Sequence, residues 1–117
     1  MKLALLLEDN LNDIVLILRS LRNIVLVTPV TDRRDYVQAL VENKFDLIIC
    51  DLNVHTFLDF ETVILAQAKQ PQTPLIVLTG SVSELDAQKT LFAGADYCIM
   101  KNGFSELQEK VKKILNL

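Results

Sequence analysis

The chain has 117 residues, half of them hydrophobic, which is the usual size of one compact domain with one buried core. A formal net charge of −3, without any long run of lysine or arginine, argues against direct binding to nucleic acid. No apolar stretch approaches the roughly 18 residues of a membrane-spanning helix, and Glu8 and Asp9 end the first apolar run too early for a signal peptide. We therefore expect a cytoplasmic protein that does not enter the membrane.

The first part of the chain alternates short apolar runs with longer amphipathic ones. Strands are predicted at residues 3–7 and 24–28, where apolar residues are nearly continuous, as in parallel strands covered on both faces. A helix is predicted over residues 12–22, with so many apolar positions that we expect it to be deeply packed. A second helix follows, with its apolar stripe at Tyr36, Val37, Leu40 and Val41.

The same alternation continues to the end of the chain. Further strands are predicted at residues 46–50, 75–79 and 97–100, and a helix around Val63, Ile64 and Ala68 lies between the first two of them.

Capping signals mark the last two helices. One begins at Ser83, with Asp86 three residues on, and Gly94 closes it; the other begins at Ser105, with Gln108 in the reciprocal position of a capping box.

Five strand–helix units in this order predict an α/β protein with a single doubly wound five-stranded parallel sheet and helices on both faces. In such sheets the functional site lies at the edge formed by the carboxyl ends of the strands. The residues that end or follow each strand are therefore the candidates for function.

Polar residues occupy four of these five strand ends. Carboxylates gathered at one place repel one another unless a cation lies among them, and oxygen ligands that leave positions for water and phosphate suit Mg²⁺. A lysine and a hydroxyl beside such a cluster would meet the oxygens of a phosphoryl group, so the pattern favours phosphoryl transfer. The residues concerned are Glu8, Asp9, Asp51, Thr79, Gly80 and Lys101.

These residues resemble the motifs of receiver domains, the chemotaxis-regulator-like domains of bacterial two-component response regulators, and the resemblance covers essentially residues 1–117. It implies a flavodoxin-like (βα)5 fold with strand order 2-1-3-4-5. It also implies that Asp51 is the phosphoacceptor, and that Thr79 and Lys101 contact the phosphoryl group. Metal binding would fall to Glu8, Asp9, Asp51 and the backbone carbonyl of Asn53.

The resemblance further implies a role in phosphorelay signal transduction. A sensor histidine kinase or phosphotransfer protein would donate the phosphoryl group in a Mg²⁺-dependent reaction. The face made by the fourth helix, fifth strand and fifth helix would then change for a downstream protein partner or effector domain, with homodimerisation through this face as an open alternative. Such a protein is not an enzyme in the usual sense, because it catalyses only its own phosphorylation and dephosphorylation. The side chains of Asn53 and Ser81 would help to set the rate of dephosphorylation.

Some positions depart from the family pattern. His55 replaces a common proline, and Asp59 stands where a glycine is usual, so the loop after the phosphoacceptor is expected to have an unusual backbone. Asn102 follows Lys101 in place of another common proline. Cys98 holds the usual position of a switch aromatic, and strand alternation places Tyr97 on the opposite face. The usual coupling between threonine and aromatic residue is therefore expected to be altered.

Three other functions compete with this interpretation. A receiver-like scaffold that is never phosphorylated would explain the departures. A Mg²⁺-dependent aspartyl phosphohydrolase would place its nucleophile at the same strand end, but such enzymes usually need a second acid where this chain has Asn53. A flavin mononucleotide binder is compatible with the fold, but no phosphate-cradling loop follows the first strand.

Overall fold

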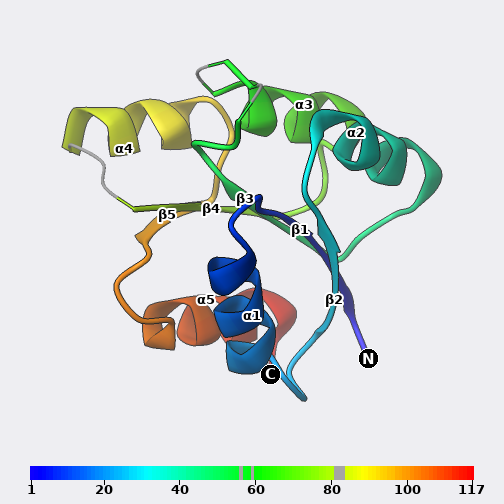
Figure 1. The fold of residues 1–117 in the computed structure, drawn as a ribbon, viewed down its shortest axis with the longest axis vertical. Coiled ribbons are helices and arrows are strands. Elements are labelled where there is room, and N and C mark those ends of the chain that lie inside the picture. The colour runs from blue at the N-terminus through cyan, green and yellow to red at the C-terminus, as the bar shows by residue number, and fades with distance from the viewer. Residues whose placement is uncertain (56, 59, 81–83) are drawn as a thin grey trace.

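A parallel sheet forms the centre of the protein (Figure 1). The computed structural model describes residues 1–55, 57–58, 60–80 and 84–117, and in this part of the chain five strands pair in the order β2-β1-β3-β4-β5. This order confirms the predicted fold class and topology. The strands are β1 (Leu3–Leu7), β2 (Leu26–Val30), β3 (Leu47–Asp51), β4 (Leu75–Thr79) and β5 (Tyr97–Met100).

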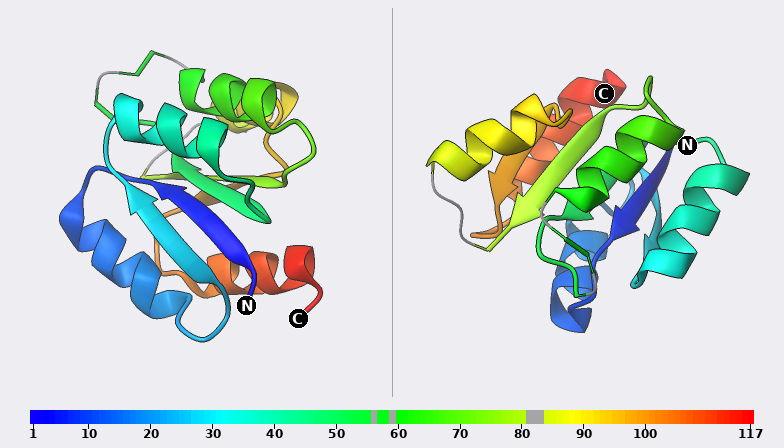
Figure 2. Two further views of the ribbon diagram at one scale, coloured as in Figure 1. Left: turned by 90° about the vertical axis from the view of Figure 1, so that its right-hand side faces the viewer. Right: turned by 90° about the horizontal axis from the view of Figure 1, so that it is seen from above.

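Helices cover both faces of the sheet. Figure 1 shows α1 and α5 on one side and α2, α3 and α4 on the other, and the right-hand view of Figure 2 looks onto the three helices of the second layer. No helix in the described ranges is both long and apolar enough to cross a membrane. The helices are α1 (Leu11–Ser20), α2 (Arg33–Glu42), α3 (Glu61–Lys69), α4 (Glu84–Phe92) and α5 (Ser105–Leu115).

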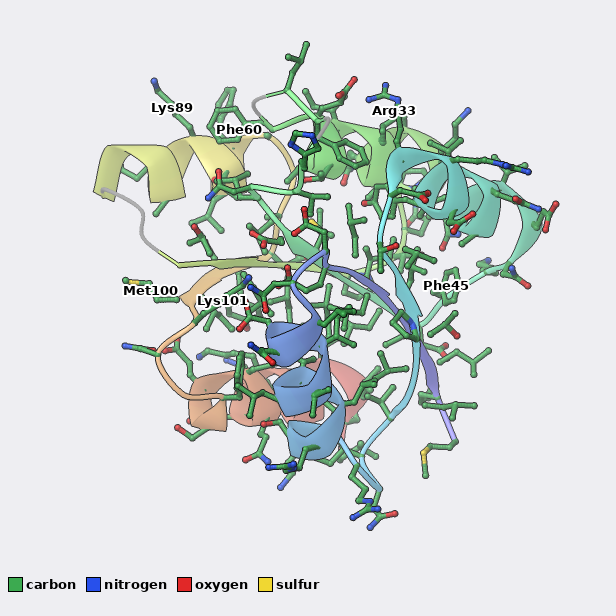
Figure 3. The ribbon with its side chains drawn as sticks, in the orientation of Figure 1. Arg33, Phe45, Phe60, Lys89, Met100 and Lys101 are labelled. Atoms are coloured by element: carbon green, nitrogen blue, oxygen red, sulfur yellow. The ribbon has the colours of Figure 1, made fainter. Side chains whose placement is uncertain are left out.

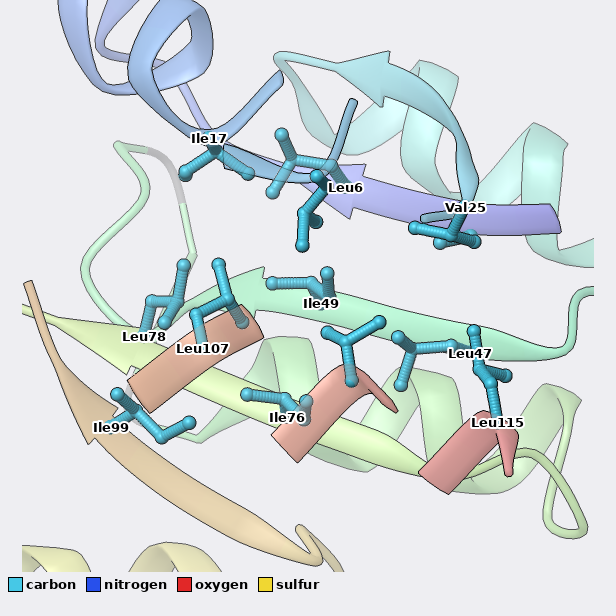
Figure 4. Packing of buried hydrophobic residues seen from close by; sticks show 13 residues of the cluster. Leu6, Ile17, Val25, Leu47, Ile49, Ile76, Leu78, Ile99, Leu107 and Leu115 are labelled. Atoms are coloured by element: carbon cyan, nitrogen blue, oxygen red, sulfur yellow. The ribbon is translucent and has the colours of Figure 1, made fainter. Parts of the chain in front are cut away.

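The strands are apolar throughout because their two faces pack against different helix layers. Leu6 and Ile49 belong to the core under α1 and α5, together with Ile17 and Leu107 from those helices (Figure 4). The neighbouring Ile48 points the other way, into the core under α2 and α3. Two separate apolar cores therefore hold the central strands, and fix the position of their carboxyl ends.

Helix α1 is less deeply packed than its composition predicts. Its buried residues are Ile14 and Ile17, and Leu21 just after the helix is also buried. The other large apolar side chains are exposed by 36% or more, which corrects the expectation of a helix with little exposed surface. Only the side of α1 that carries Ile14 and Ile17 packs against the sheet. The exposed apolar residues lie outside that buried side: Leu11, Val15, Leu16 and Leu18.

Strand β2 begins two residues later than predicted. Asn23 adopts a left-handed backbone with φ of 64°, and the N–H groups of Ile24 and Val25 both donate to the carbonyl of Leu21. These residues therefore form the turn that leaves α1. The strand instead extends to Val30 and includes Pro29, which is tolerated because β2 lies at the edge of the sheet.

Helix α5 begins at Ser105 as predicted, but its predicted capping box is wrong. Phe104 occupies the N-cap position without a side-chain cap, and Ser105 is the first helical residue. Gln108 instead donates from Nε2 to the carbonyl of Ser20 at 2.7 Å, so that it ties α5 to the end of α1.

Helix α4 closes at the predicted glycine. Gly94 has a φ of 130°, and a Cβ added there would lie 2.9 Å from Oε1 of Gln67. The predicted start at Ser83 lies outside the described residues, as do Asp59 and Ser81.

The two cysteines differ in burial. Both are free thiols, but Cys50 is buried whereas Cys98 is only partly buried. Burial raises the pKa of the Cys50 thiol to about 12.

A matched pair of substitutions tests the packing of α1. We expect Ile17→Ala to lower the free energy of unfolding by about 2–5 kcal/mol, because Ile17 is fully buried and the change leaves a cavity. Val15→Ala, at a β-branched side chain that is 52% exposed, should change it by less than about 0.5 kcal/mol. Urea denaturation followed by circular dichroism measures both values. Equal losses at the two positions would contradict the packing described.

Candidate functional site

The carboxyl ends of four strands meet at one edge of the sheet. Glu8 and Asp9 directly follow β1, Asp51 is the last residue of β3, Thr79 ends β4, and Lys101 directly follows β5. Strand pairing fixes this arrangement, because β3 lies between β1 and β4 and the N–H of Lys101 donates to the carbonyl of Thr79 at 2.8 Å. The structure thus brings together the strand-end residues that the sequence singled out.

The ammonium group of Lys101 lies among three carboxylates. Its Nζ contacts Oε1 of Glu8, and lies 2.8 Å from Oδ2 of Asp51 and 2.9 Å from Oδ2 of Asp13. Figure 3 labels Lys101, which extends from the end of β5 toward the start of α1. Burial alone would lower the pKa of Lys101, but the hydrogen bonds to these carboxylates raise it above its ordinary value. The lysine is therefore held in its charged form.

Glu8 is the most deeply buried acid of the site, with 1% of its surface exposed. Its Oε2 accepts hydrogen bonds from the backbone N–H groups of Asp9 and Asn10, at 3.0 and 3.2 Å. Burial raises the pKa of Glu8 to about 7, and the charge of Asp51 adds to this, whereas the hydrogen bond from Lys101 opposes it. The site therefore holds more negative charge than one lysine neutralises.

Asp9 completes a cluster of acidic groups. One carboxylate oxygen from each of Glu8, Asp9 and Asp51 lies within 4.8 Å of the other two, a separation at which a single metal ion can contact all three. Oδ2 of Asp9 accepts a hydrogen bond from the backbone N–H of His55 at 3.0 Å. The loop after Asp51 thus orients an acid that follows β1.

Asn53 and Thr79 border the Asp51 carboxylate. The backbone N–H of Asn53 donates to Oδ1 of Asp51 at 3.0 Å, and its Nδ2 lies 3.5 Å from Oγ1 of Thr79. Thr79 is fully buried. The proposed part of the Asn53 backbone carbonyl in metal binding stays a prediction.

The loop after Asp51 has the unusual backbone that the missing glycine suggested. Phe60, next to the position that usually holds glycine, has a left-handed φ of 58°, which is uncommon for a bulky residue.

Side-chain contacts join this loop and the start of α3 to α2. Phe57 packs edge-on against Tyr36, with their ring centres 5.9 Å apart. Arg33 pairs with both carboxylate oxygens of Glu61, at 2.6 and 2.7 Å, and this ties α2 to the start of α3.

Strand β5 keeps a regular register beside β4. Thr79 pairs with Met100 and Val77 with Cys98, so no shift brings Tyr97 to the usual position of the switch aromatic. Tyr97 instead packs toward α5, where Nζ of Lys110 lies 5.0 Å from the centre of its ring, whereas Cys98 faces the other core. The two residues therefore lie on opposite faces, as alternation predicted.

Comparison with known proteins identifies the family. A family model described as the response regulator receiver domain matches residues 6–112. The chain belongs to this family of receiver domains. Over 82 residues the receiver domain is 33% identical to the transcriptional regulatory protein ZraR of Salmonella typhimurium, a match that covers 69% of this chain. The match covers only 19% of ZraR, so the chain spans about a fifth of this curated relative.

Solved structures show the same receiver fold. The BeF3-activated DrrB receiver domain superposes with a TM-score of 0.90 at 21% identity, over 100% of this chain and 99% of that one. The receiver domain of a sensor histidine kinase from Pseudomonas aeruginosa PAO1 gives a TM-score of 0.84 at 26% identity, over 99% and 98% of the two chains.

Sequence reasoning missed two contributors to the site. Asp13 lies in the first turn of α1 rather than at a strand end, and His55 contributes through its backbone N–H. The sequence does carry a signal for Asp13, since an acid three residues after the helix-capping Asn10 lies on the turn that adjoins the strand ends. No side-chain pattern signals the contribution of His55.

The charge balance of the site can be tested on the protein without metal. We expect the carboxyl carbon of Glu8 to titrate near pH 7 in ¹³C NMR, because burial disfavours its ionised form. Lys101→Met should raise this pKa further, since the ammonium hydrogen bond favours the carboxylate. A midpoint near the ordinary 4.5 in the unsubstituted protein would contradict the burial described for Glu8.

Proposed function

We propose that this receiver domain accepts a phosphoryl group on Asp51 from a phosphohistidine of a sensor histidine kinase or phosphotransfer protein. One observation carries the proposal. The Asp51 carboxylate, at the end of β3, is held between the ammonium of Lys101 at 2.8 Å and the backbone N–H of Asn53 at 3.0 Å. These contacts orient the buried Asp51 carboxylate at the edge where phosphoryl ligands bind in such sheets.

Asp51 acts as the nucleophile in this proposal. One of its oxygens forms a bond to phosphorus while the bond from phosphorus to the donor imidazole nitrogen breaks. The imidazole leaves with the electron pair of that bond, and the product on Asp51 is an acyl phosphate. Attack of water on this phosphorus later releases inorganic phosphate and restores the carboxylate. On this view the chain is not an enzyme for other substrates, because it catalyses only its own phosphorylation and dephosphorylation.

Lys101 and Thr79 hold the transferred group. Lys101 is kept charged by its carboxylate partners, so its ammonium can donate hydrogen bonds to the phosphoryl oxygens where negative charge develops. Thr79 lies at the neighbouring strand end, with its Oγ1 3.5 Å from Nδ2 of Asn53. Its hydroxyl supplies a further donor on the side of Asp51 away from β1.

The donor set of the site suits Mg²⁺. Three carboxylates lie close together at this edge, and the pKa of Glu8 is raised. A divalent cation would offset their repulsion and favour the ionised form of Glu8. We assign Glu8, Asp9, Asp51 and the backbone carbonyl of Asn53 as its protein ligands. When bound, the cation would offset the negative charge of the phosphoryl oxygens. A magnesium ion is described in the active-site cleft of the Pseudomonas receiver domain, which supports this assignment.

Two exposed apolar surfaces suit the proposed protein partners. Leu11 and Val15 lie exposed on α1, the helix whose first turn contacts Lys101 through Asp13, and this surface suits the phosphodonor protein. Phe92 at the end of α4, exposed by 95%, and Met100 on β5 belong to the face expected to meet a downstream protein partner or effector domain. These proposed partners support a cytoplasmic location for the receiver domain.

Mass spectrometry of the intact protein tests phosphorylation directly. Incubation with Mg²⁺ and acetyl phosphate should add one phosphate to the protein but none to Asp51→Asn, which keeps the shape of the side chain and lacks the nucleophilic carboxylate. Hydroxylamine should remove the added group, as expected for an acyl phosphate. An adduct on both proteins would place the acceptor elsewhere. No adduct from any donor would favour the phosphorylation-independent scaffold.

The backbone of His55 offers a test of the metal site. The N–H of Phe57 donates to the carbonyl of Val54 at 3.2 Å, so His55 is the second residue of a turn, a position that proline favours. His55→Pro should therefore fold normally but lose the N–H that orients Asp9, and bind Mg²⁺ about tenfold more weakly. His55→Ala keeps this N–H and should bind as the unsubstituted protein does.

Isothermal titration calorimetry measures these affinities, and thermal unfolding checks the fold. Equal affinities for the proline and alanine variants would show that the hydrogen bond to Asp9 does not support metal binding.

A further inference from the structure

Asp13 differs from the other carboxylates that contact Lys101. Glu8 and Asp51 belong to the cluster of acids whose oxygens approach one another closely enough to hold a metal ion. Asp13 contacts the same ammonium at 2.9 Å but is not a member of that cluster. Among the described residues it is thus the one ion-pair partner of Lys101 that a metal ion in the cluster would not engage.

The local structure of α1 fixes the place of Asp13. Asn10 caps the helix, and its Oδ1 accepts the backbone N–H of Asp13 at 3.0 Å. The backbone of Asp13 is therefore held at the start of the helix, and its carboxylate reaches a lysine 88 positions further along the chain. The Asp13 side chain is 27% exposed and that of Lys101 11%, so the pair lies at the border between the site and solvent.

We propose that Asp13 is a positioning residue for Lys101, an inference that rests on the proposed phosphoacceptor function. In the protein without metal the three carboxylates share the ammonium. Glu8 and Asp51 would share their oxygens with a bound cation, whereas Asp13 would keep its contact with Lys101. Asp13 then keeps one N–H of the ammonium engaged and aims the other two at the phosphoryl oxygens.

A binding experiment separates this role from metal binding. Beryllofluoride mimics the phosphoryl group, and ¹⁹F NMR follows its binding in the presence of saturating Mg²⁺. We expect Asp13→Ala to weaken beryllofluoride binding about tenfold, because the ammonium loses a charged hydrogen-bond partner, while Mg²⁺ affinity stays within about twofold. Asp13→Asn keeps an acceptor for the ammonium and should lose less, about threefold. Asn12→Ala, at the adjacent exposed residue, is the control for the first turn of α1.

Two outcomes would overturn the proposal. Beryllofluoride binding by Asp13→Ala that equals or exceeds that of the unsubstituted protein would show that Asp13 does not aim Lys101. An equal loss in Asn12→Ala would show that the first turn of α1 matters only for the fold, and thermal unfolding of each variant checks this.

A second measurement distinguishes failure of this inference from failure of the proposed function. ¹H–¹⁵N NMR of the metal-free protein reports proton exchange at Nζ of Lys101. We expect this exchange to be faster in Asp13→Ala than in the unsubstituted protein or Asn12→Ala. If the unsubstituted protein fails to bind beryllofluoride, the result counts against the phosphoacceptor function. It then also counts against a role of Asp13 in that function, whatever the proton exchange at Nζ of Lys101 shows. Unchanged exchange in Asp13→Ala would count against Asp13 alone.

Discussion

The ion cluster around Lys101 joins parts of the chain that the sheet alone only brings near one another. One ammonium group contacts carboxylates that come from the end of β1, the end of β3 and the first turn of α1. An isolated buried charge is costly, so the charged form of Lys101 depends on its hydrogen bonds to these carboxylates. The cluster therefore fixes the relative positions of three loops, and any ligand that changes its charge acts on all three at once.

The two apolar cores make this concentration of charge tolerable. Both faces of β1 and β3 are covered, so the strands are anchored by packing that does not depend on the ion cluster. Repulsion among Glu8, Asp9 and Asp51 then acts on side chains at the ends of rigid strands. Burial raises the pKa of Glu8, and the charge of Asp51 adds to this effect. Folding thus maintains an arrangement of acids that is unfavourable by itself and favours a bound cation.

Much of the fold and the centre of the site could be predicted because they depend on strand periodicity. Nearly continuous apolar runs located the strands to within two residues, and the order of the polar strand ends predicted that Glu8, Asp51 and Lys101 would meet.

Other features depend on long-range packing, which periodicity does not contain. The apolar composition of α1 predicted burial, but the extent to which neighbouring elements cover a helix cannot be predicted from the sequence of that helix alone. Likewise, Gln108 matched a local capping pattern but found a partner on α1. Asp13 was missed because it reaches the site from a helix.

Pro29 affects the tendency of the protein to aggregate in concentrated solution. The N–H of Leu26 and the carbonyl of Val30 face β1, so alternation turns the backbone groups of Val27 and Pro29 toward the open side of the sheet. An open strand edge is a template on which a strand from another molecule can add, which is one route to aggregation. Proline removes one donor from this template, which also carries a Leu26 side chain that is 57% exposed. The missing donor thereby makes the edge of β2 a poorer template for strand addition.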